Sequence, residues 1–265
     1  DGKALQGLNA SGCAPQAWTP QYFHRKYGQD AKTPPKRGWD SVTVPGAVAG
    51  WVALHKRYGK LPFADLMAPA IEVAERGYAV PVIVQHKWTA AAGLAELTSQ
   101  PGFAQAFLPH GRAPHVSERF CLPAAAKTLR LIGQSHGEAF YRGEIAAAVE
   151  AYAKTHGGVM TAADKLGEFA PTRGFKAHGG AMTAADMAAY EPEWVTPISR
   201  DYRGYTLHEI PPNGQGIAAL IALGIVEKFD IASMPVDGLA SQHLQIEAMK
   251  LAFADVYKYV GEPKT

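Results

Sequence analysis

The sequence contains little cysteine, with only Cys13 and Cys121 among 265 residues. Two cysteines allow at most one disulfide and do not indicate a disulfide-stapled fold. No run of about 18 apolar residues occurs, so the sequence predicts no membrane-spanning helix. Neither positive nor negative residues are in large excess, because 26 Lys and Arg and 24 Asp and Glu give a net charge of +2. The basic residues are spread along the chain, which argues against a nucleic-acid-binding surface.

What remains is the composition of an ordinary globular protein. Hydrophobic residues make up 47% of the chain and charged residues 19%, as in typical globular domains. A chain of 265 residues suffices for one large domain or two small ones. It begins at Asp1-Gly2, without an initiator methionine or a secretory signal. Because Asp-Gly favours a turn between strands, we expect a strand before residue 1 and regard the sequence as a fragment.

The pattern along the chain is mainly helical. A strand is expected over residues 4–10, and a strand pair over residues 197–209 around Asp201-Tyr202-Arg203-Gly204. Apolar spacing and terminal glycines predict helices over 47–59, 63–76, 81–97, 122–133, 144–156, 217–229 and 238–260. Irregular structure is expected over residues 12–35 and 98–121. The strands do not alternate regularly with helices, so a Rossmann-type parallel sheet is disfavoured.

One nine-residue segment occurs twice, as HGGVMTAAD at 156–164 and as HGGAMTAAD at 178–186. In each copy a threonine precedes an aspartate by three residues, which is the spacing of a capping box. The threonine oxygen would accept a backbone N–H at the start of a helix. The aspartate would return the bond and suit the positive end of the helix. Each copy therefore predicts a helix start, capped at Thr161 and at Thr183.

Two functional interpretations compete with capping at this repeat. Glycines before a helix N-terminus can bind an anion, but neither a Gly-Lys-Ser/Thr ending nor a GxGxxG spacing is present. A metal site at His156 and His178 lacks a second ligand at a known spacing. Capping is therefore favoured over both, and the sequence predicts no metal and no other cofactor. Two copies are too few for a solenoid, so a local tandem duplication is the simplest origin.

Four longer stretches, taken together and in this order, resemble one family. They are SVTVPGAVAGWVALHKRYGKLPFADLMAPAIEVAERGYAV (41–80), AFYRGEIA (139–146), HGGAMTAADMAAYEPEWVTPISRDYRGYTLHEIPP (178–212) and HLQIEAMKLAFADVYKYVG (243–261). The set resembles the large subunit of γ-glutamyltransferases and of the related class IV cephalosporin (glutaryl) acylases. The resemblance covers most of the chain, and on it the sequence is identified as a member of this family.

The resemblance implies an α+β fold, the αββα sandwich of N-terminal-nucleophile hydrolases, with residues 1–265 as the helix-rich large-subunit portion of one domain. In this family one precursor cleaves itself into two subunits. The new N-terminal threonine of the small subunit then attacks the γ-glutamyl amide, with its own amine as base. The resemblance also implies a strand-helix-strand segment before residue 1 and a tail after residue 265. No catalytic residue is assigned in this chain, since Thr265 has its nitrogen in a peptide bond.

One substrate-binding position of the family falls inside the chain. The family's transferases carry an Arg-Glu-x-Ala-Pro segment whose arginine binds the substrate α-carboxylate, and the matching stretch is Ser11-Gly12-Cys13-Ala14-Pro15. Ser11 stands at the arginine position, and Cys13 stands where acylase-like relatives often carry an arginine. Neither side chain replaces a bidentate, permanently charged guanidinium. Strong selection of an α-amino-acid γ-glutamyl donor is therefore not expected, unless an arginine from elsewhere takes over.

The loop Pro211-Pro212-Asn213-Gly214-Gln215-Gly216 also departs from typical transferases and is similar to the acylase-like branch. A tight turn before a helix is favoured there, and substrate contact stays open. The candidate substrate-binding residues are thus Ser11, Cys13, Asn213 and Gln215. At Cys13 an inert small residue is favoured over a reactive thiol. Core packing is favoured over ligand contact for three tryptophans, Trp51, Trp88 and Trp194.

The sequence thus predicts the large subunit of a self-processed γ-glutamyltransferase-like amidohydrolase. It would act on γ-glutamyl or glutaryl amides, with hydrolysis or transfer to an amine acceptor, and hydrolysis by an acylase-like enzyme is favoured. The expected partners are the small subunit of the same precursor and a small-molecule substrate, with no nucleic acid and no membrane. A dimer of such heterodimers, a role in glutathione metabolism and a cytoplasmic or periplasmic compartment stay open. The alternative is a non-catalytic relative that keeps the scaffold for binding or assembly.

The resemblance also indicates which of the two copies of the repeat is the original. Family members usually carry one Gly-Gly-x-Met-Thr cap, and the second copy is continuous with the family's strand pair. We therefore expect residues 156–177 to be an inserted duplicate of residues 178–199 that packs at the surface. Deletion of residues 156–177 should leave self-cleavage and hydrolysis largely intact.

Overall fold

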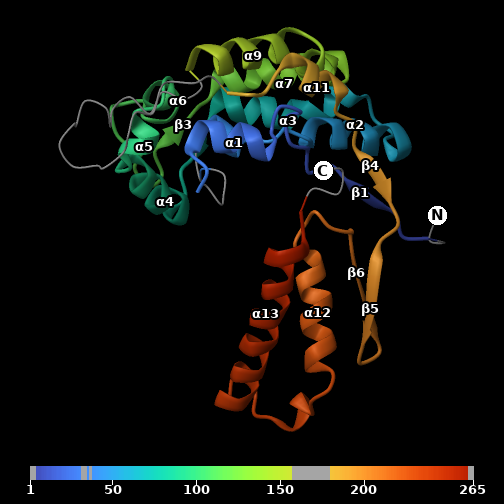
Figure 1. Cartoon of the computed structure of the whole chain (residues 1–265). Helices are drawn as coiled ribbons and strands as arrows, with labels where there is room; N and C mark the ends of the chain where they lie inside the picture. The colour runs from blue at the N-terminus through green and yellow to red at the C-terminus, as the bar shows by residue number, and fades with distance from the viewer. Residues whose placement is uncertain (1–3, 31–34, 36–37, 157–179, 262–265) are drawn as a thin grey trace. The chain divides into compact units, whose positions relative to one another are not determined.

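The computed structural model describes residues 4–30, 35, 38–156 and 180–261 (Figure 1). The chain divides into two compact units. The smaller unit consists of residues 1–13 and 191–265, and the larger unit consists of residues 14–190. The chain therefore passes from one unit to the other twice, next to Cys13 and next to Tyr190.

The larger unit is mainly helical. Its helices are α1 (Pro20–Tyr27), α2 (Ala47–Tyr58), α3 (Phe63–Arg76), α4 (Val82–Ala92), α5 (Ala95–Thr98), α6 (Phe103–Phe107), α7 (Pro123–Ser135), α8 (Glu138–Tyr141), α9 (Glu144–His156) and α11 (Ala184–Ala189). A short 3-10 turn covers Trp39–Ser41, and β2 (Tyr78–Ala79) pairs antiparallel with β3 (Arg119–Phe120). Helices α3 and α7 pack against each other, and Gly133 of α7 allows a close approach to the Ala64 backbone.

The end of α3 shows how a glycine sets the path of the chain. Gly77 follows the helix with a φ of 81°, a left-handed conformation that glycine adopts without strain. A side chain there would also collide with the carbonyl oxygen of Phe120 and with Cys121. The chain can therefore turn directly from α3 into β2 and pair with β3.

A buried tyrosine joins two of the stretches that carry the family resemblance. The Tyr141 hydroxyl donates to the carbonyl oxygen of Pro45 at 2.7 Å and accepts from the N–H of Ala49 at 2.9 Å. Burial raises the pKa of Tyr141 to about 12, against the lowering effect of the Ala49 N–H. The phenol therefore stays protonated, and it satisfies backbone groups at the start of α2.

The smaller unit combines short antiparallel strands with two helices. Strand β1 (Gly7–Asn9) pairs with β4 (Glu193–Val195), and β5 (Ile198–Tyr202) pairs with β6 (Tyr205–Glu209). The β5–β6 hairpin turns at Arg203 and Gly204, whose φ values of 51° and 86° fit the mirror-image turns that tight hairpins use. Helices α12 (Gly216–Val226) and α13 (Leu239–Tyr259) follow, with a 3-10 turn at Ile231–Ser233 between them.

Small side chains form the contact between α12 and α13. Ala218, Ala222 and Val226 from α12 pack with Ala248, Ala252 and Val256 from α13. Alanine at most of these positions lets the two helix backbones approach closely, while larger residues such as Ile221 and Phe253 flank the contact. The expected helix pair after the strand pair is therefore confirmed.

The α+β class is confirmed, as are most of the predicted elements. Three expectations of the sequence are wrong in detail. Residues 12–35 contain α1, because Thr19 caps the helix and Pro20 is favourable at its first position. The helix expected over 81–97 is split into α4 and α5 around Gly93. The irregular stretch 98–121 contains α6 and β3.

None of the helices in the described part of the chain combines the length and the apolar character that crossing a membrane requires.

Candidate functional site

Two of the four candidate substrate-binding residues meet in the smaller unit. The Ser11 hydroxyl lies 3.0 Å from Oδ1 of Asn213 and 2.7 Å from Oδ1 of Asn9. Nδ2 of Asn9 donates to Oδ1 of Asn213 at 3.1 Å, and the backbone N–H of Ser11 donates to Oδ1 of Asn9 at 3.2 Å. We call these three residues, Asn9, Ser11 and Asn213, the Asn-Ser network. Its hydrogen bonds link Asn9 and Ser11 to Asn213, which lies more than 200 positions later in the sequence.

Local structure explains how these three side chains come together. Asn9 is the last residue of β1, which is held by its pairing with β4. Asn213 lies in the tight turn between β6 and α12, as the sequence predicts for this loop. Ser11 follows β1 by two residues, and Asn9 accepts its backbone N–H as in an Asx-turn. The end of β1 and the start of α12 therefore meet through neutral polar groups.

The network offers hydrogen bonds without a charge. A serine hydroxyl has one proton, and each asparagine amide has two N–H donors. Within the described residues, Nδ2 of Asn213 has no acceptor, so its protons are available to an oxygen of a bound molecule. Such donors can orient a carbonyl or carboxylate oxygen, but their bonds are weaker than charge-assisted ones.

No arginine of this unit takes over the expected charge. Arg200 of β5 lies against Gly224 of α12 and is 3.4 Å from the carboxylate of Glu227. Arg203 donates to the carbonyl oxygen of Phe229 at 2.9 Å. Over residues 4–13 and 191–261 these are the only arginines, so the Asn-Ser network stays neutral within its own unit.

An acidic side chain occupies the start of α12. The carboxylate of Glu209, the last residue of β6, lies where a side chain on Gly216 would be. A carboxylate is favourable at the positive N-terminal end of a helix. A side chain at position 216 would displace this carboxylate. An anion in this position disfavours a second anion at the same helix end.

The other two candidates are placed differently. Gln215 is exposed. Its backbone carbonyl oxygen accepts a hydrogen bond from the N–H of Ala218 at 2.9 Å, at the start of α12. Cys13 is half-buried and forms no disulfide with Cys121. The hydrogen bonds of the Asn-Ser network include neither residue. Asn9 was missed by the sequence analysis, and the available signal was a polar residue at the end of a strand, two positions before Ser11.

The second copy of the repeated nonamer is a capping box, as predicted. Thr183 caps α11 and accepts from the N–H of Asp186 at 3.1 Å, and the Asp186 carboxylate accepts from the Thr183 N–H at 2.9 Å. The other carboxylate oxygen accepts from the N–H of Gln16 at 2.8 Å. Asp186 therefore also anchors the chain just after the Ser11–Pro15 stretch. The first copy beyond His156, including the predicted cap at Thr161, and the proposed insert lie outside the described residues.

A second ionisable cluster surrounds Asp40 in the larger unit. This carboxylate is only 1% exposed. It accepts from the hydroxyls of Tyr22 at 2.9 Å and Tyr27 at 2.7 Å, and Nζ of Lys26 lies 2.6 Å away. All three partners come from α1, so the cluster fastens this helix to the turn that contains Asp40. Its charge is matched and its oxygens are occupied, which indicates a structural role.

The same cluster predicts a loss of stability at alkaline pH. Burial lowers the pKa of Lys26, but the hydrogen bonds and charges of Asp40 and Tyr22 outweigh it, and the pKa is raised. Burial, then the hydrogen bond to Asp40, raises the pKa of Tyr27 as well. A group whose pKa is raised by folding stabilises the fold at pH values below its pKa in the unfolded chain, which is about 10 for both groups. This stabilisation is lost as the pH rises through the pKa of the folded state.

We therefore expect the free energy of unfolding to fall above about pH 10, by more than in an Asp40→Asn variant. Urea unfolding midpoints of both proteins, measured between about pH 8 and about pH 11, test this difference. Parallel curves for the two proteins would contradict it.

In the part of the chain that the structure describes, no group of three His, Cys, Asp or Glu side chains is placed to hold a metal ion.

Known proteins match the chain over nearly its full length. The family described as gamma-glutamyltranspeptidase matches residues 1–173 and 172–265. The "Glutathione hydrolase-like YwrD proenzyme" of Bacillus subtilis (strain 168) is 34% identical over 98% of this chain and 44% of its own length. The "Acylase ACY 1 proenzyme" of Pseudomonas sp. (strain SE83) is 33% identical over 85% of this chain and 36% of its own length. The chain thus spans less than half of these curated relatives.

Solved structures agree with these matches. The cephalosporin acylase from Bacillus halodurans is 42% identical with a TM-score of 0.81, over 100% of this chain and 45% of the acylase. The gamma-glutamyltranspeptidase of Helicobacter pylori is 26% identical with a TM-score of 0.81, over 98% of this chain and 68% of that chain. The similarity therefore extends to proteins named as acylases and to proteins named as transpeptidases.

Proposed function

Because this chain belongs to the gamma-glutamyltranspeptidase family, we propose that it is the large-subunit part of a self-processed amidohydrolase of the acylase-like branch. The proposed substrates are glutaryl or γ-glutamyl amides. Its fold is the helix-rich part of the family's α+β N-terminal-nucleophile hydrolase sandwich, as the similarity to the acylase and transpeptidase structures indicates. The enzyme would use a threonine at the N-terminus of a small subunit from the same precursor.

The proposed reaction places the covalent step outside this chain. The threonine hydroxyl would attack the amide carbonyl carbon while its own α-amine takes the proton. The C–N bond then breaks, the amine leaves with a proton, and water or an acceptor amine attacks the resulting ester. The role of this chain in that scheme is to hold the acyl group. We assign that role to the Asn-Ser network, with Ser11 and Asn213 as substrate-contacting residues and Cys13 and Gln215 as flanking ones.

The observation that carries this assignment is the neutral network at the position where the family's transferases carry arginine. A γ-glutamyl head group brings a carboxylate and an ammonium group, and both must leave water when the substrate binds. Hydrogen bonds from neutral donors offset less of this desolvation cost than hydrogen bonds from a guanidinium group do. A glutaryl head group has no ammonium group and one charge fewer to satisfy. The network therefore favours glutaryl over γ-glutamyl amides.

The test is a comparison of two anilide substrates on the intact, processed protein. We expect kcat/KM for glutaryl p-nitroanilide to exceed that for γ-glutamyl p-nitroanilide by roughly tenfold, the equivalent of about 1.4 kcal/mol. Ser11→Ala should raise KM for the glutaryl compound with little change in kcat, as loss of a binding contact does. Thr206→Ala, in the β5–β6 hairpin of the same unit, is the matched control. Preference for the γ-glutamyl compound would overturn the acylase assignment.

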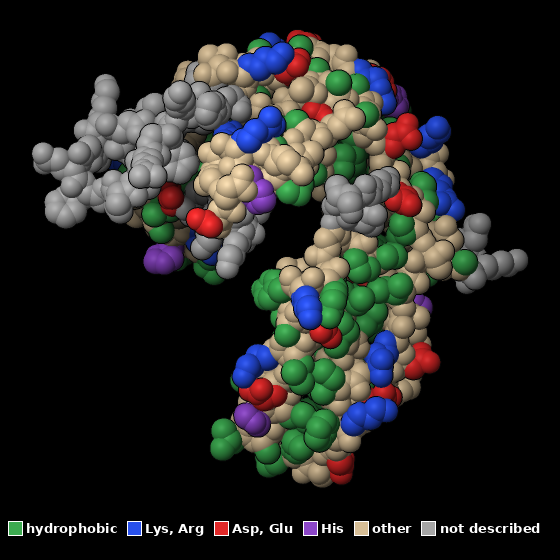
Figure 2. Space-filling view, viewed as in Figure 1, with side chains coloured by type: hydrophobic (Ala, Val, Ile, Leu, Met, Phe, Trp, Pro, Cys, Tyr) green, Lys and Arg blue, Asp and Glu red, His purple; other side chains and the backbone are tan. Residues whose placement is uncertain are grey.

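Exposed apolar side chains support a partner chain. On α13 they include Leu239 at 89%, Leu251 at 59% and Tyr257 at 77% exposure. Hydrophobic side chains also cover much of the visible face of the α12–α13 pair (Figure 2). Large exposed apolar patches mark interaction surfaces. We propose that the small subunit covers this surface.

The alternative function is a non-catalytic relative that keeps the scaffold for binding or assembly. It predicts that the precursor stays uncleaved. Mass spectrometry of the purified product separates the two proposals, because two fragments, the second starting with threonine, are expected only of the enzyme. The proenzyme names of the relatives favour the enzyme.

We also propose that residues 156–177 are an inserted duplicate of residues 178–199. The N–H of Gly180, in the second copy, donates to the carbonyl oxygen of Ala153 in α9 at 3.1 Å. Joining Thr155 directly to His178 would place Gly180 five positions after Ala153, with a glycine immediately before it. That is the spacing of the Schellman bond that ends helices. A chain without the insert could therefore end α9 with the same bond.

A further inference from the structure

The larger unit contains an apolar cavity that the proposed reaction does not use. Its volume is about 940 Å³, within the range of small-molecule sites. Helices α3, α4, α6 and α7 and the β2–β3 pair form its walls. The lining consists of aliphatic and aromatic side chains, among them Val73, Trp88, Phe107 and Phe120, together with Lys87. Lys87 is the only lining residue with a charged side chain.

The apolar stripe of α3 faces this cavity. Ala70, Val73 and Ala74 have the spacing of a helix face that packs on a core, yet they line the hollow and Val73 is 50% exposed. Trp88 is half-buried and lines it too. Trp51, at 42% exposure, is not the core residue that the sequence predicts. Part of the apolar side of α3 is therefore left for another occupant, while the rest of the helix packs against α7.

The aromatic wall of the cavity is fixed in place. Trp88 meets Phe120 edge-on, with 4.7 Å between the ring centroids, and its indole N–H donates to the carbonyl oxygen of Phe107 at 2.9 Å. Phe103 and Phe107 of α6 are in ring contact with each other at 5.4 Å. Each ring touches another ring, so a bound molecule would enter a preformed site and lose little affinity to ordering its walls.

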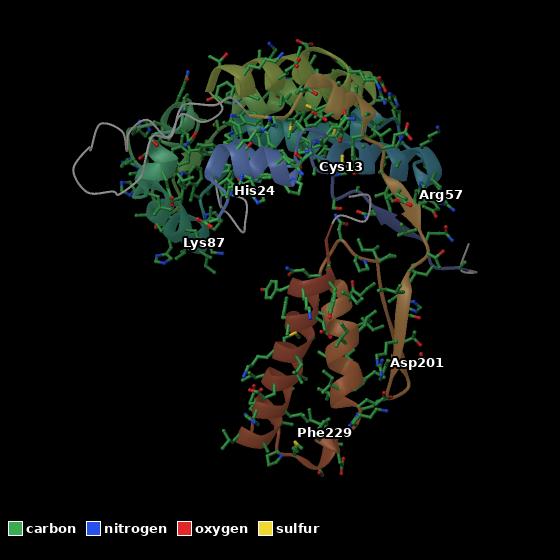
Figure 3. The ribbon with its side chains drawn as sticks, viewed as in Figure 1. Cys13, His24, Arg57, Lys87, Asp201 and Phe229 are labelled. Carbon is green, nitrogen blue, oxygen red and sulfur yellow. The ribbon has the colours of Figure 1, made fainter. Side chains whose placement is uncertain are left out.

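A single cation lies beside this apolar surface. Lys87 precedes Trp88 on α4 and is exposed (Figure 3). In the described stretches of the chain its ammonium group has no carboxylate partner. A long apolar surface with one unmatched positive charge complements a molecule with an apolar body and one anionic end.

We propose that this cavity binds an amphipathic carboxylate with an unbranched apolar chain, with the chain against the aromatic wall and the carboxylate at Lys87. The lining residues all belong to the larger unit, and the proposal does not depend on the proposed catalytic activity. A second copy of the chain could also cover an apolar surface, and self-association of the wild type is the result that would reveal it.

The test uses decanoate, octanoate and decanol on the intact protein, with Trp fluorescence and displacement of 8-anilinonaphthalene-1-sulfonate as readouts. We expect saturable decanoate binding. Octanoate should bind roughly fifteenfold more weakly, because it is two CH₂ groups shorter and each buried CH₂ contributes about fourfold. Decanol carries no carboxylate, so its affinity should not depend on Lys87.

Matched variants locate the binding site. Lys87→Gln should weaken decanoate binding about threefold, as expected for one partly exposed ion pair, and leave decanol binding unchanged. Lys127→Gln, which replaces an exposed lysine of α7 outside the cavity, should change neither. Ala91→Trp and Ala125→Phe add bulk to two walls and should each weaken decanoate binding at least tenfold, with circular dichroism as the folding check. Even if these two variants fail to fold, the Lys87→Gln comparison decides.

Three results would overturn the proposal. The first is the absence of saturable decanoate binding. The second is an equal loss of decanoate affinity in the Lys87→Gln and Lys127→Gln variants. The third is self-association of the wild type that is abolished by Lys87→Gln or by a folded cavity-filling variant.

Discussion

Replacing Asp40 with alanine is expected to lower the thermal unfolding midpoint by roughly 10 °C, from a loss of about 3–5 kcal/mol in stability. Asp40 is 1% exposed, and its carboxylate accepts from two tyrosine hydroxyls and pairs with Lys26. Its removal leaves the Lys26 ammonium group in a site where its side chain is only 11% exposed. The two hydroxyls also lose their acceptor. The penalty therefore comes mainly from the loss of the carboxylate that balances the buried Lys26 charge.

Two comparisons make this prediction specific. Lys26→Met in the Asp40→Ala background should recover part of the loss, because replacing both partners of a buried pair by apolar groups is often close to neutral. Glu247→Ala removes an exposed pair with Lys250 of similar length, 2.6 Å, and should change the unfolding midpoint little, because solvent screens exposed ion pairs. Differential scanning calorimetry measures all three. Equal effects of Asp40→Ala and Glu247→Ala would show that burial does not set the penalty.

The helices were predictable where a local signal marks both ends. The sequence predicts a helix over residues 63–76 that ends before Gly77, and α3 has these bounds. The start of α1 was missed because the aromatic and turn residues around it hide the Thr19-Pro20 start signal. The break at Gly93 was missed because apolar spacing continues on both sides. Local chemistry therefore predicts where elements lie better than where a continuous pattern is interrupted.

The cavity and the Asn-Ser network show what the sequence could not supply. The stripe of α3 predicts an apolar face but not whether protein or a hollow covers it, since that depends on α4, α6 and α7 together. Ser11 and Asn213 were candidates for separate reasons, and their contact follows from the path of β1 and the turn before α12. Asn9 has no motif of its own. Its role appears only once these elements are placed.

Replacing Asp186 with alanine is expected to cost about 3 kcal/mol, the sum of a lost helix cap and a lost charged hydrogen bond. One carboxylate oxygen of Asp186 accepts from the N–H and the hydroxyl of Thr183, and the other accepts from the N–H of Gln16. The variant therefore loosens both α11 and the chain that follows Pro15. Urea unfolding of the intact protein measures the loss.

The repeat supplies the matched control, because Asp164 occupies the same place in the first copy as Asp186 does in the second. If residues 156–177 are an inserted duplicate, the working cap is the second one, and Asp164→Ala should change stability by less than about 0.5 kcal/mol. Deletion of residues 156–177 should likewise leave precursor cleavage and anilide hydrolysis near wild-type rates, since the Gly180 bond to Ala153 keeps the end of α9 in place. Comparable losses from Asp164→Ala and Asp186→Ala, or an uncleaved deletion variant, would show that the first copy is part of the working scaffold. The two aspartates have identical neighbours for three residues before them, so a difference between them reports position in the fold and not local sequence.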